Sequence, residues 1–251
     1  MSLTQPETNS SGAILQITDL EGDENNTINF GLVKYGSVIQ NNVQRTFSVN
    51  QGWNIMSCPF FMNSLVYGHN SKSGYSSTDI VASNGQYNAF ELIKNHLYEF
   101  ESDTVPIHYK YLSEHANGGL VGRLEIFKDY LGALVAPQFN FNGIGNFDQA
   151  EGYQYKIFGN YFWKFKGTPL YNVSDNSIEV SYTFSSNGWI LMSFPYLHEI
   201  DAEFFFQELV NQNLLIIVKD FLGAAYLPAY NFNGIGNLKP GQGYQLKLQN
   251  I

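Results

Sequence analysis

The stretch IVKDFLGAAYLPAYNFNGIGNLKPGQGYQLKL, residues Ile217–Leu248, repeats an earlier stretch of the same chain. Its counterpart is IFKDYLGALVAPQFNFNGIGNFDQAEGYQYKI, residues Ile126–Ile157, and 18 of the 32 aligned positions are identical at an offset of 91. Further upstream, GWNIMSCPF (Gly52–Phe60) matches GWILMSFPY (Gly188–Tyr196) at an offset of 136. The chain is therefore predicted to contain two tandem copies of one module, and the drop in offset places 45 additional residues in the first copy.

Local patterns within the second copy predict antiparallel strands and one helix. The segments LLIIVKD and AAYLPAY flank a turn at Gly223 and indicate a hairpin, and the alternating GYQLKL indicates a closing strand. The segment WILMSFPY is continuously apolar, which is typical of a central strand. Asp201 precedes apolar residues at helical spacing and is predicted to cap a helix, whose counterpart in the first copy is Tyr87–Phe100. The expected fold is mainly β, a β-rich α+β class with two small antiparallel modules.

The repeat divides the chain into an N-terminal arm and two modules. The arm is residues 1–26, the first module is residues 27–158, and the second module is residues 159–251. The first module carries an insertion at about residues 62–122 that the second module lacks. Because insertions map to loops and loops carry function, the arm and the insertion are expected to make most contacts with other subunits. The arm segment AILQI (Ala13–Ile17) is expected to pair with the sheet edge of a neighbour.

The composition argues against some classes of partner. Aromatic residues make up 16% of the chain and charged residues only 14%, which favours a β-rich protein. The net charge of −9 argues against nucleic acid, because phosphate binding needs clustered Lys and Arg. No apolar run approaches the ~20 residues that span a bilayer, and the N-terminus lacks the features of a signal peptide. We therefore expect folding in a reducing cytoplasm, with Cys58 as a buried, unreactive thiol.

The repeated NGIGN loop shares only part of a phosphate-binding pattern. Gly143 and Gly145 in the first copy, like Gly234 and Gly236 in the second, supply two of the three glycines of a dinucleotide fingerprint. A strand rather than a helix is predicted to follow them. The glycines allow positive φ, and the flanking asparagines can bond to nearby backbone groups. The loop is therefore predicted to be structural.

Other candidate chemistry is weak. Asp129 and Asp220 precede predicted turns, where Asp commonly caps backbone amides, and the acidic segment Asp19–Asn26 lacks two defining residues of a calcium loop. Trp53 and Trp189 occupy the same strand position and are predicted to lie in the core, although exposed aromatic rings in this Asn/Gly-rich setting would suit stacking on sugars. We expect no catalytic, cofactor or metal site, since no two histidines share metal-ligand spacing. The histidines are His69, His96, His108, His115 and His198.

The repeated motifs are similar to a known family of modules. The series G-W-N-I-M-S-x-P, I-x-K-D-x-L-G, P-x-x-N-x-N-G-I-G-N and G-Q-G-Y-Q resembles repeats in structural proteins of tailed phages, particularly marine ones, and in surface-secreted proteins of aquatic bacteria. The first copy departs from the pattern at DQAEGY, where the second has KPGQGY. The positions assigned to the structural repeat are Trp53, Pro59, Asp129, Gly143, Gly145 and Tyr153, with Trp189, Pro195, Asp220, Gly234, Gly236 and Tyr244.

The resemblance implies display or assembly rather than catalysis. We expect a non-enzymatic virion structural protein of a tailed phage, such as a capsid decoration or tail-associated subunit, assembled in the host cytoplasm. Its partners would be other capsid or tail subunits and copies of itself. The alternative is a carbohydrate-binding or adhesive module at a cell surface, with a surface glycan as partner. Neither role calls for a cofactor, nucleic acid or a membrane.

Overall fold

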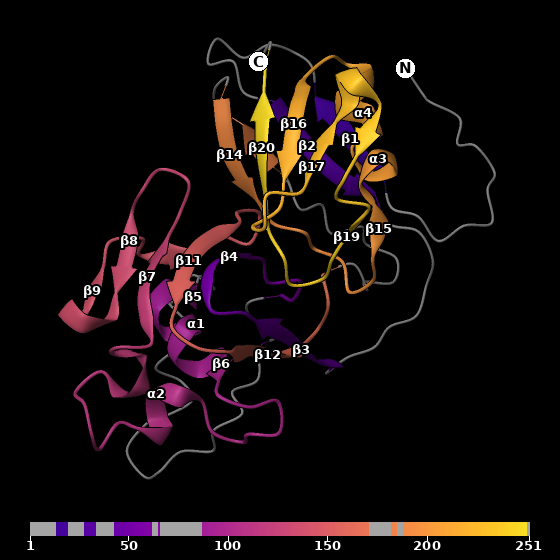
Figure 1. Cartoon of the computed structure of the whole chain (residues 1–251). Helices are drawn as coiled ribbons and strands as arrows, with labels where there is room; N and C mark the ends of the chain where they lie inside the picture. The colour runs from indigo at the N-terminus through magenta and orange to yellow at the C-terminus, as the bar shows by residue number, and fades with distance from the viewer. Residues whose placement is uncertain are drawn as a thin grey trace.

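A computed structural model describes residues 14–19, 28–33, 43–61, 65, 87–170, 182–184 and 188–249 (Figure 1). The described chain is mainly β, and its paired strands are antiparallel. The predicted β-rich α+β class is confirmed. Among the described residues, no helix has the length and apolarity needed to cross a membrane.

Each copy of the repeat forms a five-stranded sheet within the described part of the chain, and the two sheets have the same strand order. The first sheet, in order, is β4 (Gly52–Met56), β11 (Tyr153–Ile157), β7 (Leu124–Lys128), β8 (Leu134–Ala136) and β9 (Phe141–Asn142). The second, in order, is β14 (Gly188–Met192), β20 (Tyr244–Leu248), β16 (Leu215–Lys219), β17 (Ala225–Leu227) and β18 (Phe232–Asn233). Short 3-10 turns follow β8 and β17 at Pro137–Phe139 and Pro228–Tyr230. The repeated sequence therefore encodes one topology twice.

The predicted hairpin is present, but the predicted central strand is not central. Strands β16 and β17 pair around a turn in which Gly223 has a φ of 91°. The apolar strands β4 and β14 lie at the ends of their sheets, so the expectation of a central position is wrong. The ends of both strands are nonetheless buried, and the residues that follow them, Ser57 and Ser193, donate backbone hydrogen bonds to Gly241 and Ala150 in the other module.

The two modules meet in a seam that uses the repeated motifs reciprocally. The amide of Gly243 donates to the carbonyl of Ile55 at 3.0 Å, and the amide of Gly152 donates to the carbonyl of Leu191 at 3.1 Å. These two bonds are related by the offsets of the sequence repeat. A Cβ atom on Gly243 would lie 2.8 Å from the carbonyl oxygen of Met56, and one on Gly152 would lie 2.7 Å from that of Met192. The glycine of each Gly-Tyr motif is therefore required by the backbone of the other module.

Three-stranded sheets complete the two modules, and they do not follow the predicted module boundaries. In the described chain one sheet has the order β3 (Val43–Val49), β12 (Tyr161–Gly167) and β6 (Leu97–Tyr98), and the other has the order β13 (Tyr182–Phe184), β2 (Ile28–Val33) and β1 (Ile14–Asp19). Strand β12 lies beyond the predicted boundary at residue 158, yet its Trp163 and Phe165 belong to the core of the first module. Strand β2 lies at the start of the predicted first module but pairs with β13 of the second.

The N-terminal segment pairs within its own chain. Strand β1, which contains most of AILQI, is antiparallel to β2. Figure 1 shows β1 and β2 beside helix α4 and the sheet of the second module. The arm was expected to pair with the sheet edge of a neighbouring subunit, but in this structure β1 pairs with β2 of the same chain.

Helices begin at the same place in both modules. Helix α1 (Ala89–His96) has Asn88 as its N-cap, and α3 (Ala202–Phe205) has Asp201, as predicted; α4 (Gln207–Asn211) follows α3 after Phe206. The residues just before each helix form short strands that pair with residues of the NGIGN loops. These pairs are β5 (Tyr87–Asn88) with β10 (Asn146–Phe147), and β15 (Ile200–Asp201) with β19 (Asn237–Leu238).

The additional residues of the first module fall on both sides of α1. The offset between the copies falls from 136 at Pro59 to 113 at Asn88 and to 91 at Ile126. The later part contains α2 (Ile107–Lys110) and a 3-10 turn at Gly118–Leu120. The second module closes without these residues, which predicts that the first core does not need them; but Ile107 and Leu120 are fully buried in that core, so this part of the insertion is needed for packing.

Candidate functional site

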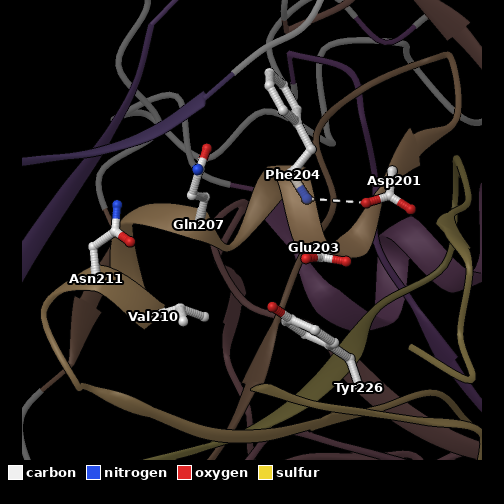
Figure 2. Close-up of a pocket in the computed structure, with 7 residues that line it drawn as sticks. All are labelled: Asp201, Glu203, Phe204, Gln207, Val210, Asn211 and Tyr226. Atoms are coloured by element: carbon white, nitrogen blue, oxygen red, sulfur yellow. Dashed lines mark hydrogen bonds between the residues drawn. The ribbon is translucent and has the colours of Figure 1, made fainter. Parts of the chain in front are cut away.

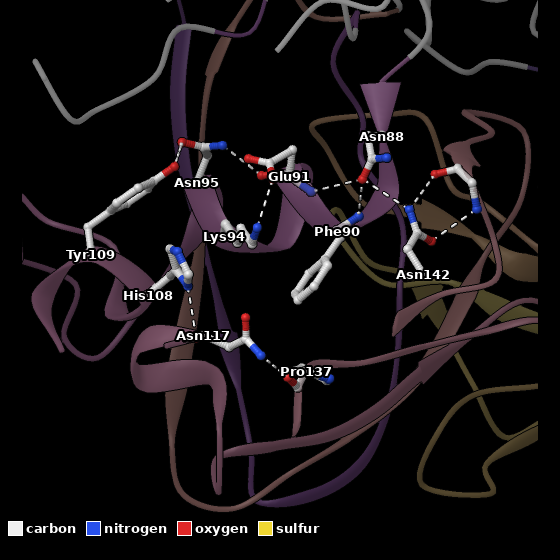
Figure 3. A network of polar contacts seen from close by, with 11 residues as sticks. Asn88, Phe90, Glu91, Lys94, Asn95, His108, Tyr109, Asn117, Pro137 and Asn142 are labelled. Atoms are coloured by element: carbon white, nitrogen blue, oxygen red, sulfur yellow. Dashed lines mark hydrogen bonds and ion pairs between the residues drawn. The ribbon is translucent and has the colours of Figure 1, made fainter. Parts of the chain in front are cut away.

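The repeated NGIGN loop holds the start of a helix in each module. In Figure 3, the Asn142 side chain accepts a hydrogen bond from the Gly145 amide at 3.0 Å and donates one to the side-chain oxygen Oδ1 of Asn88 at 3.0 Å. Asn88 caps α1 by accepting from the amides of Phe90 and Glu91. In the second module, Asn233 makes the equivalent bonds to the Gly236 amide at 2.9 Å and to the helix cap Asp201 at 3.2 Å. The polar groups of the loop therefore serve helix capping in both copies.

The two glycines of each loop are required for different reasons. Gly145 and Gly236 have φ values of 76° and 68°, in the region that favours glycine. Gly143 and Gly234 do not have positive φ, so the expectation for the first glycine is wrong. A Cβ atom on Gly143 would lie 2.8 Å from the ring of Phe141, and one on Gly234 would lie 2.9 Å from the ring of Phe232. The first glycine is needed because an aromatic ring lies against it.

The other repeat positions stabilise turns and strand ends. Asp129 accepts from the Ala133 amide at 2.9 Å, and Asp220 accepts from the Ala224 amide at 2.8 Å. The hydroxyl oxygens of Tyr153 and Tyr244 each accept a backbone amide at 2.6 Å, from Asp148 and Lys239. Pro59 and Pro195 are buried just after the apolar strands.

Two tryptophans that were predicted to lie in the core are exposed. Trp53 is 44% exposed and Trp189 is 46% exposed, and the third, Trp163, is the buried one. The ammonium of Lys128 lies 5.2 Å from the centre of the Trp53 ring, and that of Lys219 lies 5.1 Å from the Trp189 ring. The error has a physical source: an apolar run in a strand shows that side chains alternate between two faces, but not which face is covered. The environments are nonetheless equivalent, as expected for a duplication.

A second lysine completes each cluster. Lys156 lies opposite Trp53 in the pairing of β11 with β4, and Lys247 lies opposite Trp189 in the pairing of β20 with β14. We call these two groups the Trp–Lys clusters; they consist of Trp53, Lys128 and Lys156, and of Trp189, Lys219 and Lys247. Each presents an open aromatic ring with one lysine ammonium over it. In the second cluster Lys247 lies 5.9 Å from the Trp189 ring centre as well, whereas Lys156 of the first cluster forms an ion pair with Glu125 at 2.9 Å.

Further apolar side chains are exposed at matching positions in the two modules. Leu131 and Leu222 are each 77% exposed at the tips of the hairpins. Phe139 and Tyr230, in the 3-10 turns, are 75% and 79% exposed, and Phe141 and Phe232 follow at 51% and 52%. We call these six residues the exposed apolar pairs. The sequence contained their signal, since these apolar residues recur in both copies at the predicted turn, at the end of the second hairpin arm and just before the NGIGN loop.

A pocket of about 380 Å³ lies between the helices and β17 of the second module (Figure 2). Two carboxylates line it, and the lining contains no Lys or Arg. Asp201 is already engaged as a helix cap through the amide of Phe204. Burial, followed by the charges of Glu203 and Asp201, raises the pKa of Tyr226 above its ordinary value. The pocket is lined by Asp201, Glu203, Phe204, Gln207, Val210, Asn211 and Tyr226.

The later part of the insertion covers the corresponding side of α1 in the first module. In Figure 3, Asn117 donates to the carbonyl of Pro137 at 2.7 Å, and the ring of His108 contacts the carbonyl of Asn117 at 2.9 Å. Phe90 is buried beneath this cover. Burial also lowers the pKa of His108. The second module lacks these residues and is open where the pocket lies.

The titratable groups of the core do not form a metal centre. Among the described residues, no group of three or more His, Cys, Asp or Glu side chains could hold a metal ion. Burial lowers the pKa of His96 to about 4 and raises that of Cys58, which agrees with the predicted unreactive thiol. The acidic segment Asp19–Asn26 and His69 lie almost wholly outside the described residues.

Comparisons with known proteins give no family assignment. No protein-family model, no curated protein and no solved structure matches the chain. Its function is therefore argued from its own geometry.

Proposed function

We propose that this chain is a non-enzymatic structural subunit of a tailed-phage virion that acts by protein–protein assembly. The observation that carries the proposal is the set of exposed apolar pairs, which present identical or similar side chains at nearly the same exposure in both modules. Burying a large apolar side chain at an interface contributes about 1.5–3 kcal/mol, so six such residues would make a substantial contact. Large apolar groups that stay exposed commonly mark interaction surfaces.

The duplication strengthens this proposal. Two equivalent surfaces on one chain allow two equivalent contacts, and linked contacts raise the overall affinity above that of either alone. The motif resemblance to virion structural proteins points to the particle as the place of assembly, with capsid or tail subunits and further copies of the chain as partners.

The test is incorporation into particles. Mass spectrometry of purified virions should detect the chain in many copies per particle. The double variant Leu131→Ser with Leu222→Ser, and the double variant Phe139→Ser with Tyr230→Ser, should fold but lose incorporation. The matched control is Gln138→Ser, which changes an exposed polar residue next to Phe139. Absence of the chain from virions, or normal incorporation of both double variants, would refute the proposal.

A second candidate function is glycan binding by the Trp–Lys clusters. The half-exposed rings of Trp53 and Trp189 could stack on sugar rings, and the adjacent lysines favour an acidic sugar. A glycan array should then show binding that Trp53→Ala and Trp189→Ala each reduce. The control is Phe100→Ala, which removes another exposed aromatic ring from the first module. Equal binding by all four proteins, or none by the parent chain, would exclude this function.

A further inference from the structure

The middle strand of each three-stranded sheet has the same position in both modules, but it comes from a different part of the chain in each. In the first module, β12 pairs with β3, and Lys164 lies opposite Thr46. In the second module, β2 pairs with β13, and Phe30 lies opposite Tyr182, the repeat counterpart of Thr46. Strand β12 follows the closing strand β11 of its own module, whereas β2 comes from the N-terminal end of the chain. The second module is thus completed by a strand from the N-terminal end of the chain.

The third strand of each sheet follows the same scheme. Strand β6, from the residues after α1, lies beside β12, and β1 holds the corresponding position beside β2. Strands β1 and β2 pair with each other over most of their length, so they form a hairpin that enters the second module as a unit. The connection from Val33 to Val43 is the covalent link between this hairpin and the first module.

We propose that the β1–β2 hairpin is an exchangeable element that completes the second module of another copy of this chain. The pairing with β13 is made by backbone groups in a fixed register, and it is the same whether β2 belongs to the same chain or to a second copy. Exchange of an identical element between copies adds no new interface chemistry, and its cost is mainly the entropy of association. The occupant is therefore a second copy of the chain.

Exchange links two or more copies of the chain. Two chains that each donate a hairpin to the other form a closed symmetric dimer, whereas donation in one direction from chain to chain gives a head-to-tail contact. Such contacts close into rings when the rotation between subunits permits, and otherwise form open filaments. Intramolecular pairing is favoured at low concentration, because the connecting residues keep the local concentration of the hairpin high, whereas crowding of subunits in a particle favours exchange. The inference deepens the assembly role proposed above and rests on it for its biological setting.

Cysteine pairs in the β2–β13 register test the exchange. Asn29 lies opposite Thr183, so Asn29→Cys and Thr183→Cys place thiols on directly opposed residues, within the Cα separation that a disulfide needs. The two single variants are mixed, partly unfolded together in urea, refolded at high protein concentration and oxidised. The control mixture pairs Asn29→Cys with Ser48→Cys, because Ser48 lies opposite Phe162 of β12. The native Cys58 is buried and present in every sample.

The expected result is a shift on a non-reducing gel from the 28.4 kDa chain to a band of twice that mass in the test mixture and not in the control. The double variant, Asn29→Cys with Thr183→Cys, should close within one chain at low concentration and give a ladder of linked chains at high concentration. The inference is overturned if the double variant closes only within single chains at every concentration and the test mixture stays monomeric. These measurements do not involve particles, so the virion role can stand or fail separately.

Discussion

Truncating each of the three tryptophans gives a direct test of which face of each strand is covered. The indole of Trp163 is 1% exposed, it packs against Phe165 with ring centres 6.0 Å apart, and its Nε1 donates to the Tyr155 hydroxyl at 2.9 Å. Trp163→Ala should cost about 3–5 kcal/mol for the lost packing, and about 1–3 kcal/mol more if the buried Tyr155 hydroxyl is left without this donor. Trp53→Ala removes a half-exposed ring and a lysine contact, which together contribute about 1–2 kcal/mol.

Urea unfolding measured by circular dichroism distinguishes these values. With a slope of about 3 kcal/mol/M for a chain of this size, Trp163→Ala should lower the midpoint by more than about 1 M. Trp53→Ala and Trp189→Ala should each lower it by about 0.5 M and should agree with each other, because their environments are equivalent. Trp163→Phe is an informative control, since it keeps most of the packing and removes the donor. Equal losses for Trp53→Ala and Trp163→Ala would refute the assignment of the outer face.

Three further predictions follow from the repeated motifs and the seam. Asn142→Ala and Asn233→Ala should each lower the free energy of unfolding by about 1–2 kcal/mol, because each removes a hydrogen bond to a helix cap and one to a loop amide. Urea midpoints equal to that of the parent chain would contradict this. Gly243→Ala should lower the free energy of unfolding by about 1–3 kcal/mol, since its Cβ would overlap the backbone of Met56. Hydrogen exchange should then be faster at the amide of residue 243, which lies in the seam. Burial and the charges of Asp148 and Asp129 raise the pKa of Glu151 from 4.5 to about 7. The stabilising effect of its proton is therefore complete below pH 4.5 and is lost as the pH rises through about 7. Glu151→Gln should flatten the fall in melting temperature over this pH range, and an unchanged slope would disprove the role of this group.

The insertion and the pocket illustrate how duplicated modules diverge. The first module uses Ile107 and Leu120 to extend its core over α1, and the second leaves the corresponding side open beside Tyr226. A segment that a sequence comparison defines as extra can therefore be part of the core of the module that carries it.

Much of the fold could be predicted from local sequence. The duplication is visible in the sequence itself, and the hairpin at Gly223, the helix cap at Asp201 and the turn role of Asp220 depend on residues close together in the chain. The structural role of the NGIGN loop was also accessible, because its asparagines and glycines bond within a few residues of themselves.

The partners of the strands and the faces they cover were decided by the tertiary structure alone. Backbone hydrogen bonds are the same for every residue, so the sequence of β2 carries no local sign that it pairs with β13 rather than with β3. Alternation in a strand defines two faces, but the exposure of Trp53 depends on what lies above the sheet, which is set by residues distant in the chain. Likewise, the need for glycine at Gly152 and Gly243 comes from the backbone of the opposite module. Sequence thus determined the module, and long-range packing determined how two modules share strands and a seam.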